Sequence, residues 1–557
     1  MSIPAKENIG SFNLLIENAV KKFWELESIS DYQIQTLSYK DVARKIEKLH
    51  ILFEESGIKH GDKIALCGRN SANWGVAFFA TLTYGAVAVP LLHEFKEEQI
   101  HNCVNHSEAK LLFVGDYIKT IISPEEMPNL EGIINLPDFS LMTCRSEKLE
   151  HARKNLNAMF GKKFPERFTQ DDICYYKEQD PDELALINYT SGTTGHSKGV
   201  MIPYRAMWSN YDFALHIING HYHPGMKGIC MLPMAHMYGM AFELILEFCI
   251  GIHINCLTRT PSPAVILKAF QDLKPFLIIS VPLIIEKIIK KRIFPELQNH
   301  RMKILMNTPA LRLKVRSKLC ERLKEIFGNN FYELIIGGAA LNQEVEEFLH
   351  QIKFPMTVGY GATECAPIIC YEDWYNAPLG SCGKAVRNME VRIDSTDPRT
   401  IPGEIMVRGL NVMLGYYKDE AETKQAFVNG WFKTGDLGIM DEEGNIFIKG
   451  RSKNMLLSAN GQNIYPEEIE DKLNSLPFVM ECVVVQRDEK LVALVYPDYD
   501  EAQNDGLDKE DLQAVMEENL STLNELMPTY SKITKIELRE EEFEKTAKKS
   551  IRRFLYK

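Results

Sequence analysis

The sequence has no C-x-x-C pair, although its twelve cysteines are spread over the whole length. This spacing excludes zinc fingers and thioredoxin-like redox motifs, and it favours reduced thiols in a cytoplasmic protein. The first residues, MSIPAKENIGSF, contain no apolar signal core. The common nucleotide-binding loop G-x-x-x-x-G-K-[ST] is also absent, because Lys198 is followed by Gly199.

An excess of positive charge is lacking as well. The formal net charge is −12, so we expect no broad basic surface and no nucleic-acid partner. The most apolar stretch, residues 238–257, is interrupted by Glu243, Glu247 and His253. It therefore predicts a buried helix and strand and no membrane span. For Glu243 and Glu247 themselves, a position facing solvent is equally compatible with the sequence.

The length of 557 residues, with 45% hydrophobic and 25% charged residues, indicates a globular protein of two or more domains. Helical patterns alternate with short β-rich runs, which predicts α/β layers. The pattern changes near residue 450. A helix is expected to start after Pro466, a hairpin to turn at residues 487–490, and KEDLQAVMEENLSTLNEL to form a helix. These last hundred or so residues are expected to form a small module of their own.

Residues 188–201, NYTSGTTGHSKGVM, combine hydroxyl side chains, glycines and one lysine. Apolar residues on both sides, LALIN and VMI, predict two buried strands that hold this loop. Backbone N–H and hydroxyl groups can surround phosphate oxygens, and a lysine can add positive charge. The residues expected to bind phosphate are Thr190, Ser191, Gly192, Thr193, Thr194, Gly195 and Lys198.

Three further loops carry the remaining chemistry of a nucleotide site. In GYGATE, residues 359–364, Tyr360 can stack on a purine, Thr363 can bond phosphate and Glu364 can hold magnesium. Asp436 in KTGDLG can accept both ribose hydroxyls, and Arg451 in GRSKN is a forked donor. Each loop alone is compatible with an ordinary turn. Together they predict binding of base, ribose, phosphates and metal.

These loops occur within a longer series of motifs in a characteristic order. The series is YTSGTTGHSKGVM, LPMAHMYGM, GGAAL, VGYGATE, GYYKDEAETKQAF, GWFKTGDLG, GRSKNMLLSANGQNIYPEEIE and FEKTAKKSIRRF. It resembles the adenylate-forming superfamily of acyl-CoA synthetases, luciferases and peptide-synthetase adenylation domains, over nearly the whole chain. Ser197 stands where that family usually has proline.

The resemblance implies an α/β fold with a large N-terminal adenylate-forming domain, residues 1–452, and a small α+β C-terminal domain, residues 453–557, joined by a hinge. It implies that a carboxylate attacks the α-phosphate of ATP, giving acyl-AMP and pyrophosphate, and that a thiol then releases AMP. Mg²⁺ and coenzyme A are the expected cofactor and co-substrate. The implied contacts are Thr363 with the α-phosphate, Glu364 with magnesium, Tyr360 and Gly338 with adenine, and Asp436 and Arg451 with ribose. Ala339 and Gly361 are also expected to bind the cofactor.

The resemblance also assigns residues to the second half-reaction. His236 would line the carboxylate pocket and gate the thiol channel, although a histidine packed on an apolar face is the alternative that the residues alone favour. Lys453 would be the hinge between the two poses. Gly461 would lie against the pantetheine channel, and it is also compatible with a simple turn.

The C-terminal tail departs from the family ending T-P-x-x-K-I-x-R, whose lysine reaches ATP and the carboxylate. Aligned on Thr546 and Ile551, Ser550 stands in the place of that lysine. A neutral hydroxyl cannot supply the missing charge. We therefore expect Lys549, or as second choice Lys548, to reach the α-phosphate.

The sequences of the motifs are most similar to those of bacterial long-chain fatty acyl-CoA ligases, which implies a fatty acid as substrate. Three alternatives stay open: an acyl carrier protein as the thiol acceptor, an aryl or medium-chain acid, and a degenerate nucleotide-binding sensor. The expected location is the cytoplasm. The basic and aromatic tail KKSIRRFLYK is compatible with peripheral contact at the inner face of an anionic membrane, although a solvated tail is the simpler interpretation.

Overall fold

A computed structural model of the chain describes residues 8–115, 117–190, 197–258, 262–297, 309–457, 462–487, 490–546 and 551–556. The remaining positions include Ser191, Gly192, Thr193, Thr194 and Gly195 of the phosphate loop. They also include Gly461, Lys548, Lys549 and Ser550, so the predictions for all these residues lie outside the described residues.

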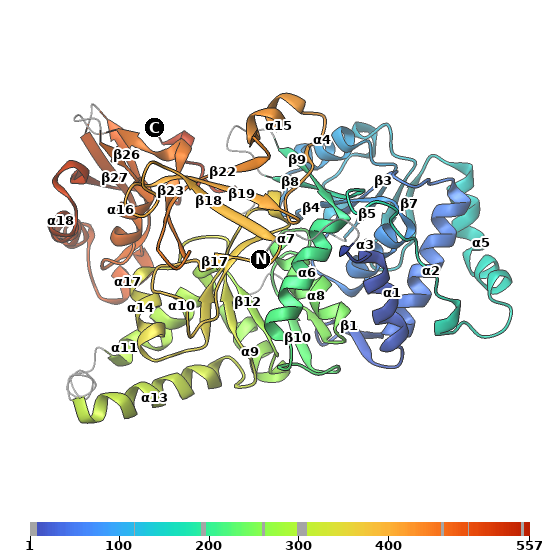
Figure 1. Cartoon of the computed structure of the whole chain (residues 1–557), viewed down its shortest axis with the longest axis horizontal. Coiled ribbons are helices and arrows are strands. Elements are labelled where there is room, and N and C mark those ends of the chain that lie inside the picture. The colour runs from blue at the N-terminus through green and yellow to red at the C-terminus, as the bar shows by residue number, and fades with distance from the viewer. Residues whose placement is uncertain are drawn as a thin grey trace.

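An eight-stranded sheet, in which parallel pairs predominate, is built mainly from residues 63–203 (Figure 1). Its order is β20 (Gly415–Tyr416), β9 (Lys198–Pro203), β8 (Leu184–Thr190), β4 (Val87–Leu91), β3 (Lys63–Cys67), β5 (Leu111–Val114), β6 (Gly132–Asn135) and β7 (Leu141–Cys144). Strands β8 and β9 are the two strands that the sequence predicts on either side of the phosphate loop. They pair antiparallel, with Thr190 opposite Lys198, so both ends of the loop are fixed by the sheet.

A four-stranded sheet of order β10 (Lys227–Cys230), β11 (His253–Cys256), β1 (Glu27–Asp31) and β2 (Gln35–Ser38) lies beside the first sheet. Helix α3 (Ala72–Tyr84) contacts β3 and β4 of the first sheet and β1 of the second, so it lies between them. The π-helical segment Met240–Ile245 and α8 (Leu246–Cys249) contact β10 and β11. This buried helix followed by β11 confirms the prediction for residues 238–257.

The outer helices are amphipathic, and their ends follow from local sequence. Helix α2 (Tyr39–Ser56) starts at a capping box of Ser38 and Asp41 and ends at Gly57, whose φ is +85°. The neighbouring helices are α1 (Phe12–Lys22), α4 (Glu97–Ser107), α5 (Glu147–Lys163), α6 (Tyr204–Ile218) and α7 (Met237–Gly239). No helix among the described residues is long and apolar enough to span a membrane.

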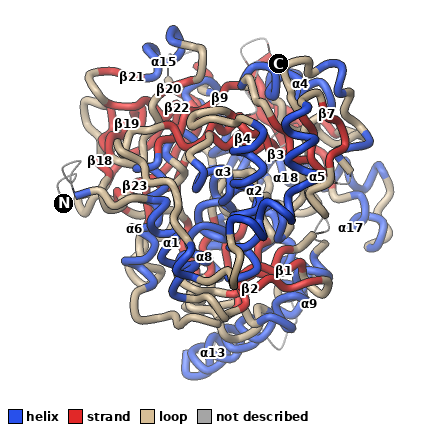
Figure 2. Tube along the Cα trace, turned by 90° about the vertical axis from the view of Figure 1, so that its right-hand side faces the viewer, coloured by secondary structure: helices blue, strands red, loops and turns tan. Residues whose placement is uncertain are grey.

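A three-stranded parallel sheet, β12 (Ile278–Ser280), β13 (Leu334–Ile336) and β14 (Met356–Val358), continues the fold with its own apolar core. The helices around it are α9 (Pro263–Leu273), α10 (Pro282–Arg292), α11 (Phe294–Leu297), α13 (Pro309–Ile326) and α14 (Gln343–Gln351). Helix α13 extends away from the body at the lower left of Figure 1 and at the bottom of Figure 2.

Two antiparallel sheets complete the large domain. The first contains β15 (Tyr360–Gly361), β16 (Ile368–Tyr371) and β17 (Lys384–Ala385). The second contains β18 (Met389–Asp394), β19 (Gly403–Gly409), β22 (Trp431–Met440), β21 (Phe427–Val428) and β23 (Ile446–Arg451). Helix α15 (Glu420–Ala426) precedes β21. The motifs GYGATE and GRSKN fall on the ends of β15 and β23 and on the turns that follow them, whereas KTGDLG lies within β22 and not at its end.

The C-terminal residues form a module with a separate core, seen in orange and red at the upper left of Figure 1. Its strands are β24 (Leu456–Leu457), β25 (Asn463–Ile464), β26 (Val479–Arg487), β27 (Lys490–Pro497) and β28 (Ile533–Leu538). Its helices are α16 (Pro466–Leu473), α17 (Tyr499–Asn504) and α18 (Lys509–Leu526). The predicted helix start at Pro466, the hairpin closing at Arg487 and Lys490, and the long helix are confirmed.

Candidate functional site

One large cavity, with a volume of about 2120 Å³, contains every predicted site residue that the structure describes. These residues are Thr190, Lys198, His236, Gly338, Ala339, Tyr360, Gly361, Thr363, Glu364, Asp436, Arg451 and Lys453. They come from six separate stretches of sequence. The fold therefore brings together the groups that motif analysis could only list one after another.

The pairing of β22 with β23 creates the pair expected to bind ribose. Asp436 lies directly opposite Arg451 in the strand register, and Arg451 Nε lies 2.7 Å from Asp436 Oδ1. The hydroxyl of Tyr360 donates to the other carboxylate oxygen, Oδ2, at 2.6 Å. Burial raises the pKa of Asp436, and the Arg451 charge acts against that rise. Three polar side chains from three strands thus form one fixed group on the cavity wall.

Two glycines allow the backbone to border this group closely. Gly338 has a φ of +88°, a conformation that a residue with a side chain rarely adopts. A Cβ atom on Gly361 would collide with the carbonyl oxygen of Pro367. Both positions therefore require glycine for local reasons, and both line the cavity.

A second polar group joins the phosphate loop to GYGATE. The Lys198 ammonium forms an ion pair with Glu422 of α15 and lies 5.1 Å from the centre of the Tyr416 ring. The Tyr416 hydroxyl donates to Glu364 Oε1 at 3.1 Å. The lysine predicted for phosphate and the carboxylate predicted for metal are therefore two ends of one connected network. Carboxylate oxygens are the donors that Mg²⁺ prefers, so Glu364 fits a magnesium ligand.

Sequence reasoning missed Tyr416 and Glu422 as members of this network. Both residues lie in the motif GYYKDEAETKQAF, which carries the family resemblance, but nothing in the motif indicates that they face Lys198. Pairing of β20 with β9 brings Tyr416 opposite Val200, two residues from Lys198. Only this non-local register, which crosses more than two hundred residues of sequence, reveals the contact.

His236 begins the short helix α7, and its Nδ1 accepts the backbone N–H of Tyr238 at 3.3 Å. With Nδ1 as acceptor, a neutral ring carries its proton on Nε2. The preceding residue is held by Asn188 of β8, whose amide donates to the Ala235 carbonyl at 2.9 Å. The predicted histidine is therefore fixed next to the strand that leads into the phosphate loop.

The cavity has an apolar part in addition to its polar wall. Phe213, Ala214 and Ile217 of α6 line it, together with Leu277 and Ile279 around β12. Tyr371 of β16 also lines it, and its hydroxyl donates to Glu333 Oε2 at 2.6 Å. Burial raises the pKa of Glu333 to about 8. The lining thus changes from charged to aliphatic within one connected space.

Glu243 and Glu247 do not face solvent, which corrects the position that the sequence left open. Each side chain is 1% exposed, and Glu243 Oε2 accepts the backbone N–H of Leu232 at 2.9 Å. Burial raises the pKa of both carboxyl groups well above the ordinary value. Neither residue lines the cavity. The four-residue spacing places both on the side of the helix that packs against β10 and β11.

The C-terminal module also contributes to the cavity. Thr546 and residues 551–554 line it, and Arg553 forms an ion pair with Glu470 of α16. The second oxygen of Glu470 accepts the backbone N–H of Val484 at 2.6 Å, and burial raises the pKa of Glu470 to about 7. Tyr556 packs edge-on against Phe543, with ring centres 5.1 Å apart. The described part of the tail is therefore packed on its own module.

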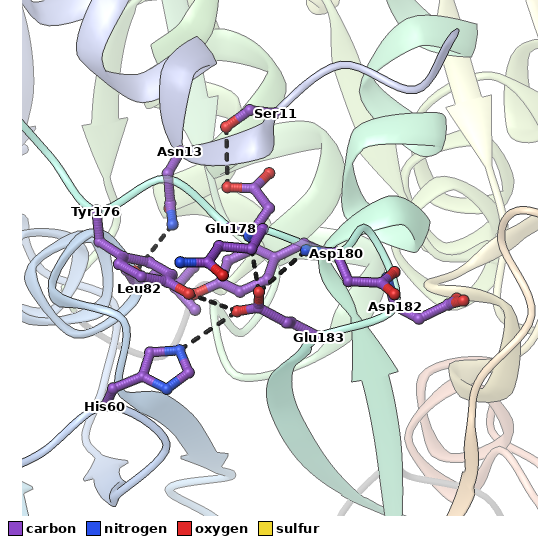
Figure 3. Close-up of polar contacts among 11 residues, drawn as sticks. Ser11, Asn13, His60, Leu82, Tyr176, Glu178, Asp180, Asp182 and Glu183 are labelled. Carbon is purple, nitrogen blue, oxygen red and sulfur yellow. Dashed lines mark hydrogen bonds and ion pairs between the residues drawn. The ribbon is translucent and has the colours of Figure 1, made fainter. Parts of the chain in front are cut away.

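A further polar cluster lies elsewhere (Figure 3). Ser11 donates to Glu178 Oε2 at 2.8 Å, and the Tyr176 hydroxyl donates to Glu183 Oε2 at 2.6 Å. None of the residues labelled in Figure 3 lines the cavity. Asp182 of the same segment pairs with Arg205 of α6, whose guanidinium also donates to the Val412 carbonyl at 2.8 Å. The cluster fastens α1, residues 176–183 and α6 to one another, which is a structural role.

Comparison with known families agrees with this geometry. The family of AMP-binding enzymes matches residues 16–417, and the AMP-binding enzyme C-terminal domain matches residues 453–556. The chain therefore belongs to the AMP-binding enzyme family, with a large N-terminal and a smaller C-terminal domain.

Individual relatives differ in the acid that their names give. A long-chain-fatty-acid–CoA ligase of Mycobacterium bovis, FadD15, is 28% identical over 462 residues, covering 77% of this chain and 72% of the relative. A 2-succinylbenzoate–CoA ligase of Listeria innocua is 26% identical over 87% of this chain and 88% of its own. The o-succinylbenzoate CoA synthetase of Bacillus subtilis, solved with an acyl-adenylate, has the same fold, with a TM-score of 0.75 at 20% identity over 98% and 97% of the two chains.

Proposed function

We propose that this chain is an acid–thiol ligase that activates a fatty acid with ATP and transfers the acyl group to coenzyme A. The first step gives acyl-AMP and pyrophosphate, and the second gives acyl-CoA and AMP. One observation carries the proposal: a single cavity joins the residues expected for base, ribose, phosphate and metal to an aliphatic space. Family membership supports the same chemistry.

In the first step, negative charge develops on the oxygens of the α-phosphate, so fixed donors there lower the barrier. We assign this role to Thr363 and to the phosphate loop with Lys198. Tyr360, Gly338, Ala339 and Gly361 hold the adenine, and the Asp436–Arg451 pair holds the ribose. A magnesium ion held by Glu364 would supply positive charge to the polyphosphate.

The basic group that approaches the α-phosphate from the C-terminal module is proposed from sequence. Lys549 is the first choice and Lys548 the second, because Ser550 stands in the place of the family lysine. The flanking residues Thr546 and Ile551 both line the cavity, which supports a lysine from this segment. A chain without such a lysine would be the degenerate sensor.

For the second step, we propose that the C-terminal domain, residues 453–557, rotates about Lys453 relative to residues 1–452. Lys453 lies in a 3₁₀ turn, Ser452–Asn454, between β23 and β24. A short turn that lines the cavity can change its torsions without disturbing either core. In the second pose Gly461 would border the channel for pantetheine, and His236 would lie at its inner end.

The aliphatic part of the cavity favours a fatty acid over an amino acid, and the long-chain relative agrees. The 2-succinylbenzoate relative keeps an aryl acid as the second candidate. An acyl carrier protein is an alternative acceptor, since the same acyl-AMP serves both thiols. We propose a cytoplasmic location for the reaction.

The experiment is a thioester assay with a panel of acids, with coenzyme A and a carrier protein offered separately. We expect a long-chain acyl-CoA as the main product, identified by its mass. If an aryl-CoA is the main product, the substrate is an aryl acid and not a fatty acid. If the product is found only on the carrier protein, the acceptor is the carrier protein and not coenzyme A.

A further inference from the structure

Positive charge is concentrated on one projecting part of this acidic protein. Helices α10, α11 and α13 together contain ten lysines and arginines but four glutamates, whereas the whole chain has a net charge of −12. One of those glutamates, Glu286, is turned inward, because it accepts the backbone N–H of Asn342 at 2.9 Å. The outward charge of this region is therefore more positive than its composition alone suggests.

Helix α13 is attached by one half and projects with the other. Leu319, Cys320 and Leu323, in its C-terminal half, are buried in the apolar core around β12–β14. Its N-terminal half exposes apolar side chains, since Leu313 is 73% exposed and Leu311 is 41% exposed. Both views show the helix at an edge of the molecule (Figures 1 and 2).

The basic side chains on the projecting half are not neutralised by the part of the chain that the structure describes. Arg312, Lys314 and Lys318 are exposed, and none of them forms an ion pair with any residue that the structure describes. Leu311, Lys314 and Lys318 are spaced three and four residues apart, so they share one face of α13, whereas Leu313 points to the other side. A helix face that combines exposed basic side chains with an exposed leucine can lie on the surface of an anionic bilayer.

We propose that α13 is the surface with which this protein docks on an anionic lipid bilayer. Lys314 and Lys318 attract the lipid head groups, and Leu311, on the same face, enters the boundary of the acyl chains. The docking surface proposed here is therefore α13 and not the C-terminal tail.

The position of α13 also suits the supply of substrate. This inference rests on the proposed function, in which the substrate is a fatty acid. Ile266 of α9 and Leu283, Ile284 and Lys287 of α10 line the cavity, and α9 contacts both α10 and α13. Leu283 is 41% exposed, so this part of the cavity wall reaches the surface. A bilayer beneath α13 would bring dissolved fatty acid to this side of the cavity.

The test is sedimentation of the full chain with vesicles, in the absence of ATP and acid, so that it does not depend on catalysis. Vesicles of equal parts phosphatidylglycerol and phosphatidylcholine are compared with phosphatidylcholine alone. We expect the protein to sediment with the anionic vesicles, and more weakly as salt is raised. The double variant Lys314→Gln, Lys318→Gln should lower the partition coefficient roughly tenfold or more.

The matched control is Lys154→Gln, Lys162→Gln on α5, which removes two exposed lysines from a helix at the opposite side of Figure 1. This control should sediment like the wild type. Leu311→Ser keeps every charge and should still weaken vesicle binding. Equal melting temperatures show that all variants are folded.

Three results would overturn the proposal. The wild type could stay in the supernatant with anionic vesicles, or the α13 and α5 variants could sediment equally. Alternatively, the protein could ignore vesicles and bind an acidic carrier protein in a manner that Lys314→Gln, Lys318→Gln abolishes. That last result would assign α13 to a protein partner.

Discussion

Tyr416 connects the two charged groups that the sequence predicts for phosphate and metal. Its ring lies beside the Lys198 ammonium, and its hydroxyl donates to Glu364. Each charged side chain therefore has a fixed orientation before nucleotide binds, which is the condition for electrostatic stabilisation of a transition state. The ribose pair has the same property, since Asp436 is held by Tyr360 as well as by Arg451.

Glu364→Gln should lower the rate of acid-dependent pyrophosphate exchange by about a hundredfold or more, because the amide no longer attracts the metal. The control is Glu372→Gln, which removes a carboxylate that pairs with Lys384 at 2.9 Å and lies outside the cavity. That control should keep its exchange rate. Exchange by Glu364→Gln within a few-fold of the wild type would remove this residue from the site.

Glu333 makes stability depend on pH. Its pKa is about 8 in the folded chain, against an ordinary value of 4.5, because burial disfavours the carboxylate. Between these values the unfolded chain has lost the proton that the folded chain keeps. The contribution to stability is therefore complete below pH 4.5 and declines by about 1.4 kcal/mol per pH unit up to pH 8.

Glu333→Gln keeps a group that can bond the Tyr371 hydroxyl and cannot ionise. The melting temperature of the wild type minus that of this variant should therefore fall as pH rises from 5 to 8. Calorimetry at each pH measures this difference, and the exposed Glu420→Gln serves as the comparison variant. A constant difference for Glu333→Gln would mean that the carboxyl group is ionised in the folded protein.

At the scale of elements, the turn after β23 is the proposed boundary between the large and small domains. Helix α16 contacts β23, and Lys449 of β23 forms an ion pair with Glu468 of α16 at 2.9 Å. These contacts hold the small domain in its present position. The second half-reaction would require them to change while both cores stay intact.

Lys453→Pro should fix the φ of the proposed hinge and impair rotation. We expect pyrophosphate exchange to survive and thioester formation from supplied acyl-AMP to fall by up to about a hundredfold, because the thiol would be misplaced. Lys453→Ala, which leaves φ free, should retain both half-reactions. If Lys453→Pro loses both equally, the substitution acts on folding and the hinge assignment fails.

The elements were largely predictable because their signals are local. Alternation in ECVVVQRDEKLVALVYPD predicts β26 and β27, and the position of Pro466 predicts the start of α16. The contacts between elements were not predictable in this way. The burial of Glu243 and Glu247 and the network of Tyr416 and Glu422 depend on strand pairing and layer packing, which a single sequence does not encode locally.

At the scale of the molecule, the motifs predicted which residues belong together, whereas the fold determines how they are arranged. Residues from Thr190 to Arg553 line one cavity, which continues from a charged wall into an aliphatic space. A nucleotide and an apolar acid could therefore meet inside one space. This arrangement is the physical basis for assigning the two-step ligase reaction to the chain.

Acid-dependent exchange of labelled pyrophosphate into ATP tests that assignment most directly, because it requires nucleotide, metal and acid to react in the same cavity. We expect exchange with wild-type protein and Mg²⁺ when a long-chain fatty acid is present, and none when the acid is omitted. If ATP binds, as a separate binding measurement would show, but no acid of the panel supports exchange, the chain is a nucleotide-binding sensor and the ligase assignment is wrong.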